Sequence, residues 1–179
     1  MSDEECIWWN PKFTLSLEHF KGEPDVEKPH HANTRVNFQY FFDHEVRKTA
    51  SKNKMRIKKI DVKCFVNTSK SWIKKEVLTN TNLPFLLKHE EGHFDLAEEY
   101  ARLIKIKMNA KFNGKSFSYE SMTIEGAVKE INEILGKEFQ IYTNEYKKAN
   151  ERYDVETNYG RTISKQTEYN QRFNKLHNE

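Results

Sequence analysis

The stretch LLKHEEGHFDLAEEYARL, residues 86–103, places two histidines four positions apart inside a helical hydrophobic pattern. Leu86, both histidines, Leu96 and later Tyr100 recur at intervals of three and four residues, which is the spacing of one face of an α-helix. The pattern ends at Asn113-Gly114, a pair typical of a helix C-terminus. The stretch therefore predicts a long helix from about residue 81 to residue 113, with His89 and His93 on its buried face.

Helical spacing continues through the second half of the chain, whereas the first half predicts β-strands. A long helical pattern runs from about Thr123 towards Tyr153, and a short polar one covers residues 164–176. Apolar and polar residues alternate over 8–17, 35–42 and most clearly 58–66, and residues 21–33 form a proline-containing loop. We expect an α+β fold with a mostly antiparallel sheet: one domain over residues 1–179, strand-rich from about 8 to 66 and helical from about 81 to 176.

The composition argues against several classes of protein. The 179 residues include 12 Phe, 8 Tyr and 3 Trp, too many aromatic residues for a disordered chain. The net charge of +3 creates no concentrated basic surface, so nucleic acid is not an expected partner. No apolar run approaches the roughly 20 residues of a membrane-spanning helix. Cys6 and Cys64 fit either one disulfide or two buried thiols.

His89, Glu90 and His93 form the motif HExxH. Two histidines four positions apart on a helix can bind one metal ion, because both side chains lie on the same face. Glu90 lies about 100° around the helix, where its carboxylate can hydrogen-bond a water molecule beside the metal. In zinc peptidases the metal lowers the pKa of this water to about 7, and the glutamate moves its proton. The alternative is a pair of core histidines with ordinary hydrogen-bonding partners.

Gly92 lies between the two histidines, in a position where glycine costs about 1 kcal/mol relative to alanine. We expect that the missing side chain leaves room for backbone or substrate to approach. The third ligand that a catalytic zinc requires is not evident nearby, because no histidine occurs in the ten residues FDLAEEYARL that follow His93. The only later histidine is His177, close to the C-terminus.

Several segments resemble a bacterial family of predicted secreted zinc-dependent proteases, known chiefly as a domain of unknown function. The similar segments are LEHFKGEP (17–24), SWIK (71–74), LLKHEEGHFDLAEEYAR (86–102), YDVETNYG (153–160) and the following Gln166. They are spread over nearly the whole chain. The resemblance implies a zincin-like peptidase fold, export from the cell and zinc held by the HExxH helix.

The resemblance also directs attention to residues 153–159 for the third ligand. The family usually has a histidine two positions after the threonine of its Glu-Thr pair, but this sequence has Tyr159 there. Glu156 is our first candidate, since its carboxylate could reach the same metal, and Tyr159 is the alternative, which would bind as a phenolate. Another acid such as Glu125, or no third ligand at all, remains open. We expect Asp154 and Tyr153 behind the ligands, where a side chain can orient an imidazole.

The sequence thus predicts a monomeric zinc metalloprotease that hydrolyses peptide or protein substrates, with Glu90 as general base. One alternative is a zincin-like binding module that has lost catalysis, suggested by Tyr159. Another is a lysine-rich protein that binds an acidic polymer.

The start, MSDEECIWW, lacks the basic and apolar regions of a signal peptide. We therefore expect a secreted or periplasmic location if a signal peptide precedes this sequence, and a cytoplasmic one if Met1 is the native start.

Overall fold

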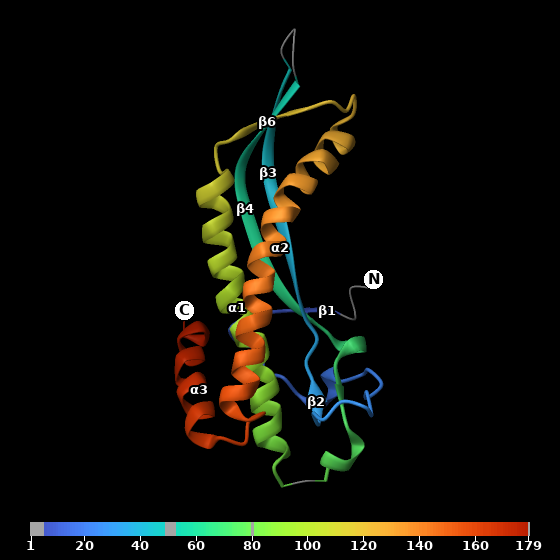
Figure 1. The fold of residues 1–179 in the computed structure, drawn as a ribbon, viewed down its shortest axis with the longest axis vertical. Coiled ribbons are helices and arrows are strands. Elements are labelled where there is room, and N and C mark those ends of the chain that lie inside the picture. The colour runs from blue at the N-terminus through green and yellow to red at the C-terminus, as the bar shows by residue number, and fades with distance from the viewer. Residues whose placement is uncertain (1–5, 49–52, 80, 179) are drawn as a thin grey trace.

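The computed structural model describes residues 6–48, 53–79 and 81–178, and shows an α+β fold built along one long β-hairpin (Figure 1). Strands β3 (Val36–Lys48) and β4 (Asn53–Asn67) pair in antiparallel fashion over their whole length. β1 (Cys6–Trp8) and β6 (Ser116–Tyr119) pair with opposite ends of β4, which is therefore the central strand. Met1, on which the expected location depends, lies outside the described residues.

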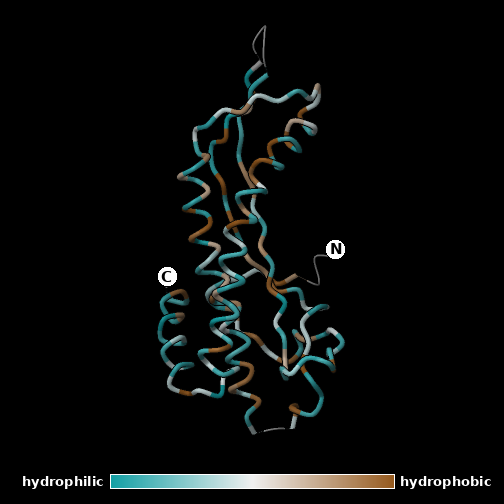
Figure 2. The backbone as a smooth tube through the Cα atoms, viewed as in Figure 1, coloured by the Kyte–Doolittle hydropathy of each residue, from teal (hydrophilic) through white to brown (hydrophobic). Residues whose placement is uncertain are grey.

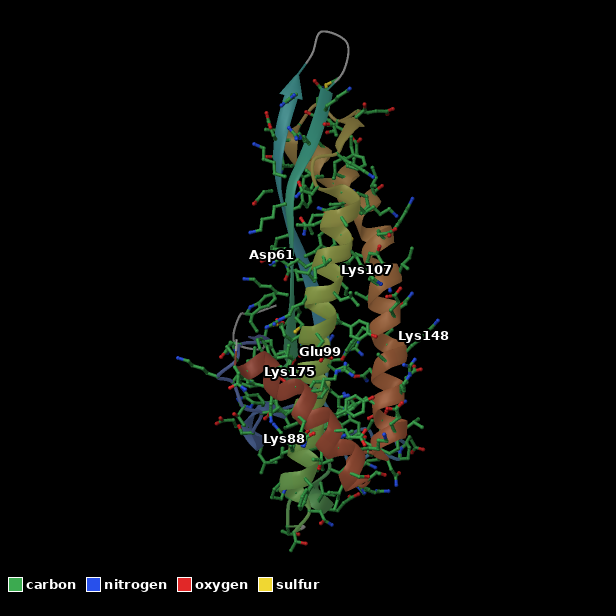
Figure 3. The ribbon with its side chains drawn as sticks, turned by 90° about the vertical axis from the view of Figure 1, so that its left-hand side faces the viewer. Asp61, Lys88, Glu99, Lys107, Lys148 and Lys175 are labelled. Carbon is green, nitrogen blue, oxygen red and sulfur yellow. The ribbon has the colours of Figure 1, made fainter. Side chains whose placement is uncertain are left out.

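Among the described residues, three α-helices follow the hairpin, as the sequence predicts, with the short strand β6 between the first two. α1 (Leu83–Phe112) and α2 (Ile124–Thr157) run side by side along the hairpin (Figures 1 and 3). α1 packs on β4, and α2 contacts β3 through the ring pairs Phe38–Tyr146 and Tyr40–Phe139. α3 (Ile163–His177) packs against α1 near Glu99, whose carboxylate pairs with Arg172. The predicted α+β fold, with strands before helices, is confirmed.

The alternating pattern of β4 places one face of the strand in the core. Ile60, Val62, Cys64 and Val66 are all buried, as their period of two predicts. The register of β3 and β4 shifts between Asp43 and His44, because Asp43 pairs with Lys59 but His44 with Ile57. The extra residue, Lys58, forms a β-bulge, which lets Ile57 and Ile60 face the same core although they are three positions apart.

Hydrophobic residues recur along β3, β4, α1 and α2, whereas α3 is mainly hydrophilic (Figure 2). The buried side chains of the core come from β4, α1 and α2, with Tyr119 of β6 and Phe173 and Leu176 of α3, and β3 packs partly buried residues against them. No helix among the described residues is long and apolar enough to cross a membrane.

The structure differs from the sequence-based prediction in the first 35 residues. Within the expected strand at 8–17 only Trp8 belongs to a strand, β1, and after the Trp9 amide, which donates to the Cys64 carbonyl at 3.1 Å, residues 10–17 leave the sheet. Side chains of α1 bind this segment instead: the Trp9 indole donates to Asp95 at 3.0 Å, and the Leu15 amide donates to Glu91 at 3.1 Å. The expected loop at 21–33 contains the two-residue strand β2 (Ala32–Asn33), which pairs with β5 (Trp72–Ile73).

The two thiols are not joined, because Cys6 and Cys64 are both free. Burial, together with the nearby Glu98 carboxylate, raises the pKa of the Cys64 thiol well above its usual range. Cys64 therefore belongs to the hydrophobic core and is not a nucleophile.

Asn109 of α1 completes the hydrogen bonding of β4 between the short strands β1 and β6. Its side-chain oxygen accepts from the Ile60 amide at 2.9 Å, and its side-chain nitrogen donates to the Ile60 carbonyl at 2.6 Å. The amide thus replaces a neighbouring strand at this point.

We expect Asn109→Ala to lower the free energy of unfolding by about 1–3 kcal/mol, because both backbone groups of Ile60 would lose their partner. Urea unfolding monitored by circular dichroism measures the change. Gln140→Ala is the matched control, since the exposed Gln140 bonds only Asn144 on the same helix; it should change stability by less than about 0.5 kcal/mol. Equal effects of the two substitutions would contradict the role of Asn109.

Candidate metal centre

The three residues of the HExxH motif are all buried on α1. His89, Glu90 and His93 expose only 1%, 3% and 7% of their surface. The two imidazole rings face each other edge to face, with ring centroids 4.7 Å apart. The helix thus delivers both histidines and the glutamate to one place, as the four-residue spacing predicts.

Asp154 of α2 faces both histidines. Its Oδ1 atom lies 3.1 Å from Nε2 of His89 and 3.1 Å from Nε2 of His93. The ligand atoms of these three residues lie within 4.8 Å of one another. The first half of α1 and the C-terminal end of α2 therefore meet in one cluster of two imidazoles and one carboxylate.

The other nitrogen of each imidazole is held by an amide oxygen. Nδ1 of His89 lies 3.1 Å from Oε1 of Gln166, and Nδ1 of His93 lies 2.8 Å from Oδ1 of Asn150. An amide oxygen only accepts hydrogen bonds, so each Nδ1 carries its proton and each Nε2 is left to face Asp154. This second pair of contacts fixes the ring orientation that a metal-binding histidine requires.

The contacts within the cluster shift the pKa values of Asp154 and His93. Burial opposes the charged forms of Asp154 and His93, but hydrogen bonds outweigh it. The bonds from His89 and His93 hold the pKa of Asp154 well below its usual range, and the bond to Asp154 together with the charge of Glu90 raises the pKa of His93 to about 9. The carboxylate at the centre is therefore always ionised near neutral pH and requires a positive charge beside it, either a proton on an imidazole or a metal ion.

A tetrahedral zinc ion fits this set of donors. Two imidazoles and one carboxylate form a three-residue ligand set of the kind found in catalytic zinc sites, which leave the fourth position open. Donors bound at about 2.1 Å to one tetrahedral ion lie about 3.4 Å apart, and Asp154 lies 3.1 Å from each histidine nitrogen. His89, His93 and Asp154 are therefore the residues that would hold the ion.

Glu90 lies beside the cluster and opens into the same small cavity. Its Oε2 atom accepts a hydrogen bond of 2.7 Å from the Thr34 hydroxyl, which positions the carboxylate. The cavity has a volume of about 60 Å³, enough for an ion and one water molecule, since each water occupies about 30 Å³ in the liquid. Its lining residues are His30, Ala32, Asn33, Thr34, Glu90, His93, Asn150, Asp154 and Tyr159.

Tyr153 packs behind His89 and explains Gly92. The Tyr153 ring stacks on the His89 ring at 4.7 Å, and its hydroxyl donates to the His89 carbonyl at 3.1 Å. Gln166 donates to the same hydroxyl at 2.8 Å, so one glutamine holds both the tyrosine and the imidazole. A Cβ atom on Gly92 would lie 2.1 Å from the Tyr153 hydroxyl. The glycine therefore admits this tyrosine, where we had expected backbone or substrate.

The structure does not bring Glu156 to the histidines. α2 continues to Thr157, and residues two apart on a helix point about 200° away from each other. Asp154 therefore faces α1, whereas Glu156 is exposed and accepts a hydrogen bond of 2.7 Å from Tyr169. Glu125 lies 29 positions before Asp154 on the same helix, about 44 Å away along its axis.

Tyr159 follows the end of α2 and lines the same cavity as Glu90, His93 and Asp154. Its ring lies against that of His30, with centroids 5.2 Å apart. Asp154, which we had expected behind the ligands, thus takes the place proposed for Glu156, and the proposed role of Tyr159 as a ligand stays a prediction. Tyr153 lies behind His89, where we had expected it.

Sequence reasoning assigned no role to four residues of the site, Asn150, Thr34, His30 and Gln166, although Gln166 is part of the resemblance. Asn150 could have been found, because it lies four positions before Asp154 on the same helical face. Gln166, Thr34 and His30 come from other elements, and no local pattern places them beside the HExxH helix.

A second acidic group lies on another side of α1, formed by Glu91, Asp95 and His177. Asp95 already accepts from Trp9 at 3.0 Å and from His177 at 2.9 Å, and Glu91 accepts from the Leu15 amide and from Lys88. These bonds fasten the N-terminal segment and α3 to α1, so protein donors already occupy the acidic oxygens.

Comparisons with protein-family models, with curated proteins and with solved structures gave no significant match. The resemblance to secreted zinc-dependent proteases therefore stays a prediction, and the function has to be inferred from the geometry of the site.

We expect Gly92→Ala to destabilise the protein by about 1–3 kcal/mol, because the new methyl group would displace the buried Tyr153. Gly136→Ala is the matched control. A Cβ on Gly136 would meet its nearest neighbour, the Tyr40 hydroxyl, at an ordinary 3.6 Å. This substitution in α2 should stabilise the protein by up to about 1 kcal/mol. Urea unfolding of both variants should give shifts of opposite sign, and a stabilised Gly92→Ala protein would contradict the packing described.

The stability of the metal-free protein should fall as the pH rises from about 6.5 to 9. Folded His93 keeps its proton up to a pKa of about 9, whereas an unfolded histidine loses it near pH 6.5. The folded state therefore binds the extra proton over this range, and the free energy of unfolding falls by up to about 1.4 kcal/mol per pH unit. Urea unfolding in the presence of a chelator measures the slope.

Asp154→Asn should flatten this pH dependence, because the neutral amide no longer favours the protonated form of His93. His177, whose pKa is also raised, contributes equally to both proteins and cancels in the comparison. Identical slopes in the wild type and the variant would show that Asp154 does not hold the proton on His93.

Proposed function

We propose that the protein is a zinc-dependent peptidase whose metal is held by His89, His93 and Asp154. The observation that carries this proposal is the contact of one carboxylate oxygen with Nε2 of both histidines, each at 3.1 Å, while amide oxygens hold both Nδ1 atoms. Structural zinc sites usually have four protein ligands, so a set of three leaves a position for chemistry. Glu90, which could act as a base, opens into the same cavity.

Zinc bound at this site would lower the pKa of a water molecule to about 7 and polarise a carbonyl group. Glu90 would accept the proton of this water and later donate it to the departing amine. The Thr34 hydroxyl, 2.7 Å from Oε2 of Glu90, holds the carboxylate in place for both transfers. Gln166 and Asn150 keep the two imidazoles in the tautomer that turns Nε2 towards the ion.

The non-catalytic alternative was motivated by Tyr159, which left the predicted ligand set without its usual histidine. Asp154 supplies a third ligand from an unexpected position, so this reason for favouring a binding module no longer applies. We therefore favour an enzyme that acts on peptides or proteins, and its export remains a proposal based on the resemblance alone.

Metal content separates the two acids of α2 that could complete the site. Purified wild-type protein equilibrated with zinc and dialysed should retain about one zinc per chain by elemental analysis. Asp154→Ala should lose most of it, whereas Glu156→Ala should retain it, because Glu156 is exposed and turned away. Zinc loss in Glu156→Ala with retention in Asp154→Ala would overturn the assignment.

Hydrolysis tests the catalytic part of the proposal. Zinc-loaded wild-type protein should cleave peptides from a mixed-sequence library, detected by mass spectrometry. Glu90→Gln should retain zinc but lose activity by about 10²-fold or more, because the amide cannot accept the proton of the water. A zinc-loaded wild-type protein that cleaves no peptide would contradict the peptidase proposal while leaving the metal site intact.

A further inference from the structure

A larger cavity adjoins the metal centre. It has a volume of about 460 Å³, within the roughly 300–1,000 Å³ typical of sites that bury a ligand. The start of α1, the turn after α2 and the start of α3 form its walls. Its lining residues are His31, Glu76, Val77, Asn82, Leu83, Phe85, Leu86, Tyr159, Gly160, Arg161 and Ile163.

The turn between α2 and α3 connects this cavity to the metal centre. Tyr159 lines both cavities. Gly160 lines the larger one and packs directly on His89, since a Cβ atom on Gly160 would lie 2.9 Å from Cβ of His89. A molecule in the larger cavity therefore lies next to the HExxH helix at its first histidine.

The backbone of this turn is unusual. Asn158, Tyr159 and Gly160 all have positive φ angles, of 48°, 55° and 80°. A non-glycine residue such as Tyr159 rarely adopts this conformation, and such residues are concentrated at functional sites. Arg161 then bonds His31 across the cavity wall at 3.2 Å, which fixes the turn against the loop before β2. The conformation places the Tyr159 side chain between the two cavities.

The two cavities differ in size and therefore suit different parts of a substrate. The 60 Å³ beside Glu90 has room for an ion and one water but is too small for a large side chain of a substrate. The adjoining 460 Å³ can hold one or two large side chains. A peptide whose scissile bond reaches the metal centre can therefore place a neighbouring side chain in the larger cavity.

The chemistry of the larger cavity favours an uncharged, apolar occupant. Its lining includes Val77, Leu83, Phe85, Leu86 and Ile163. Phe85 and Ile163 expose 57% and 66% of their surface, so an apolar ligand would bury apolar area on binding. Among the ionised groups of the lining, Glu76 and Arg161 have opposite signs. Neither an acidic nor a basic side chain is therefore favoured by net charge.

We propose that this cavity is the specificity pocket of the peptidase and binds a large apolar side chain, aromatic or aliphatic, of the substrate next to the cleaved bond. The inference rests on the proposed function, because it assigns the occupant as part of a peptide that reaches the metal centre. Burial of one such side chain contributes about 1.5–3 kcal/mol, or roughly ten- to a hundredfold in affinity.

Binding and cleavage are measured separately. Fluorescein-labelled hexapeptides that differ at one central position (Phe, Leu, Gly or Asp) are titrated with zinc-loaded Glu90→Gln protein, and fluorescence anisotropy gives their affinities. The Phe and Leu peptides should bind roughly ten- to a hundredfold more tightly than the Gly and Asp peptides. The same peptides are then incubated with zinc-loaded wild-type protein, and the cleaved bond is identified by mass spectrometry.

Two substitutions test the pocket. Phe85→Asp and Ile163→Asp place a charge in it and should reduce the affinity for the Phe peptide by about tenfold or more, without loss of zinc. Ile106→Asp is the control, because Ile106 lies on α1, is 67% exposed and does not line the cavity. Thermal unfolding checks that all three variants fold, and zinc content checks the metal centre independently of activity.

The possible outcomes test the apolar pocket and the peptidase activity separately. Tight binding of the Phe and Leu peptides that is lost in the two pocket variants supports the pocket, and cleavage next to the apolar residue completes the assignment. The same binding with no cleavage by wild-type protein would overturn the peptidase proposal, and with it the assignment of the occupant as a substrate. Equal affinity for the Phe and Asp peptides, or equal effects of Ile163→Asp and Ile106→Asp, would overturn the pocket even if peptides are cleaved.

Discussion

The ionised carboxylate of Asp154, partly buried between two helices, is the constraint on which the rest of the structure depends. A carboxylate withdrawn from water has to be paired with positive charge or with hydrogen-bond donors, and here both histidines of the HExxH motif face the same oxygen. This contact fixes how α1 and α2 pack near the C-terminal end of α2. A proton can supply the required charge in the metal-free protein, and a divalent metal ion can supply it with greater effect because it binds all three groups at once.

The surrounding structure holds this cluster in place from three directions. α3 contributes Gln166, which contacts both His89 and Tyr153. Gly92 admits Tyr153 against α1, so a single missing side chain determines how closely the two helices approach. The N-terminal segment is bonded to Asp95 and Glu91 on another side of α1, beside the two histidines in sequence. Contacts from α2, α3 and the N-terminal segment thus meet at the part of α1 that carries the two histidines.

Local patterns predicted the elements of the fold but only part of the site. The alternation of Ile60, Val62, Cys64 and Val66 predicted a half-buried strand, and the spacing of His89 and His93 predicted a shared helical face, because both depend on residues close in sequence. Asp154 and Glu156 could not be separated in this way. Which of them faces α1 depends on the rotation of α2 about its own axis, and this rotation is set by the packing of Tyr146, Tyr153 and Thr157 in the core. Gln166 and Thr34 reach the site through tertiary contacts alone.

The most direct test of the central claim is nitrogen-15 NMR of the histidine side chains, recorded on metal-free and zinc-loaded protein with His89 and His93 assigned by substitution. The structure predicts that zinc moves the Nε2 signals of both residues to the values of metal-bound nitrogen, while both Nδ1 atoms stay protonated against Gln166 and Asn150. Unchanged histidine signals at saturating zinc, or binding through Nδ1, would contradict a metal centre formed by His89, His93 and Asp154.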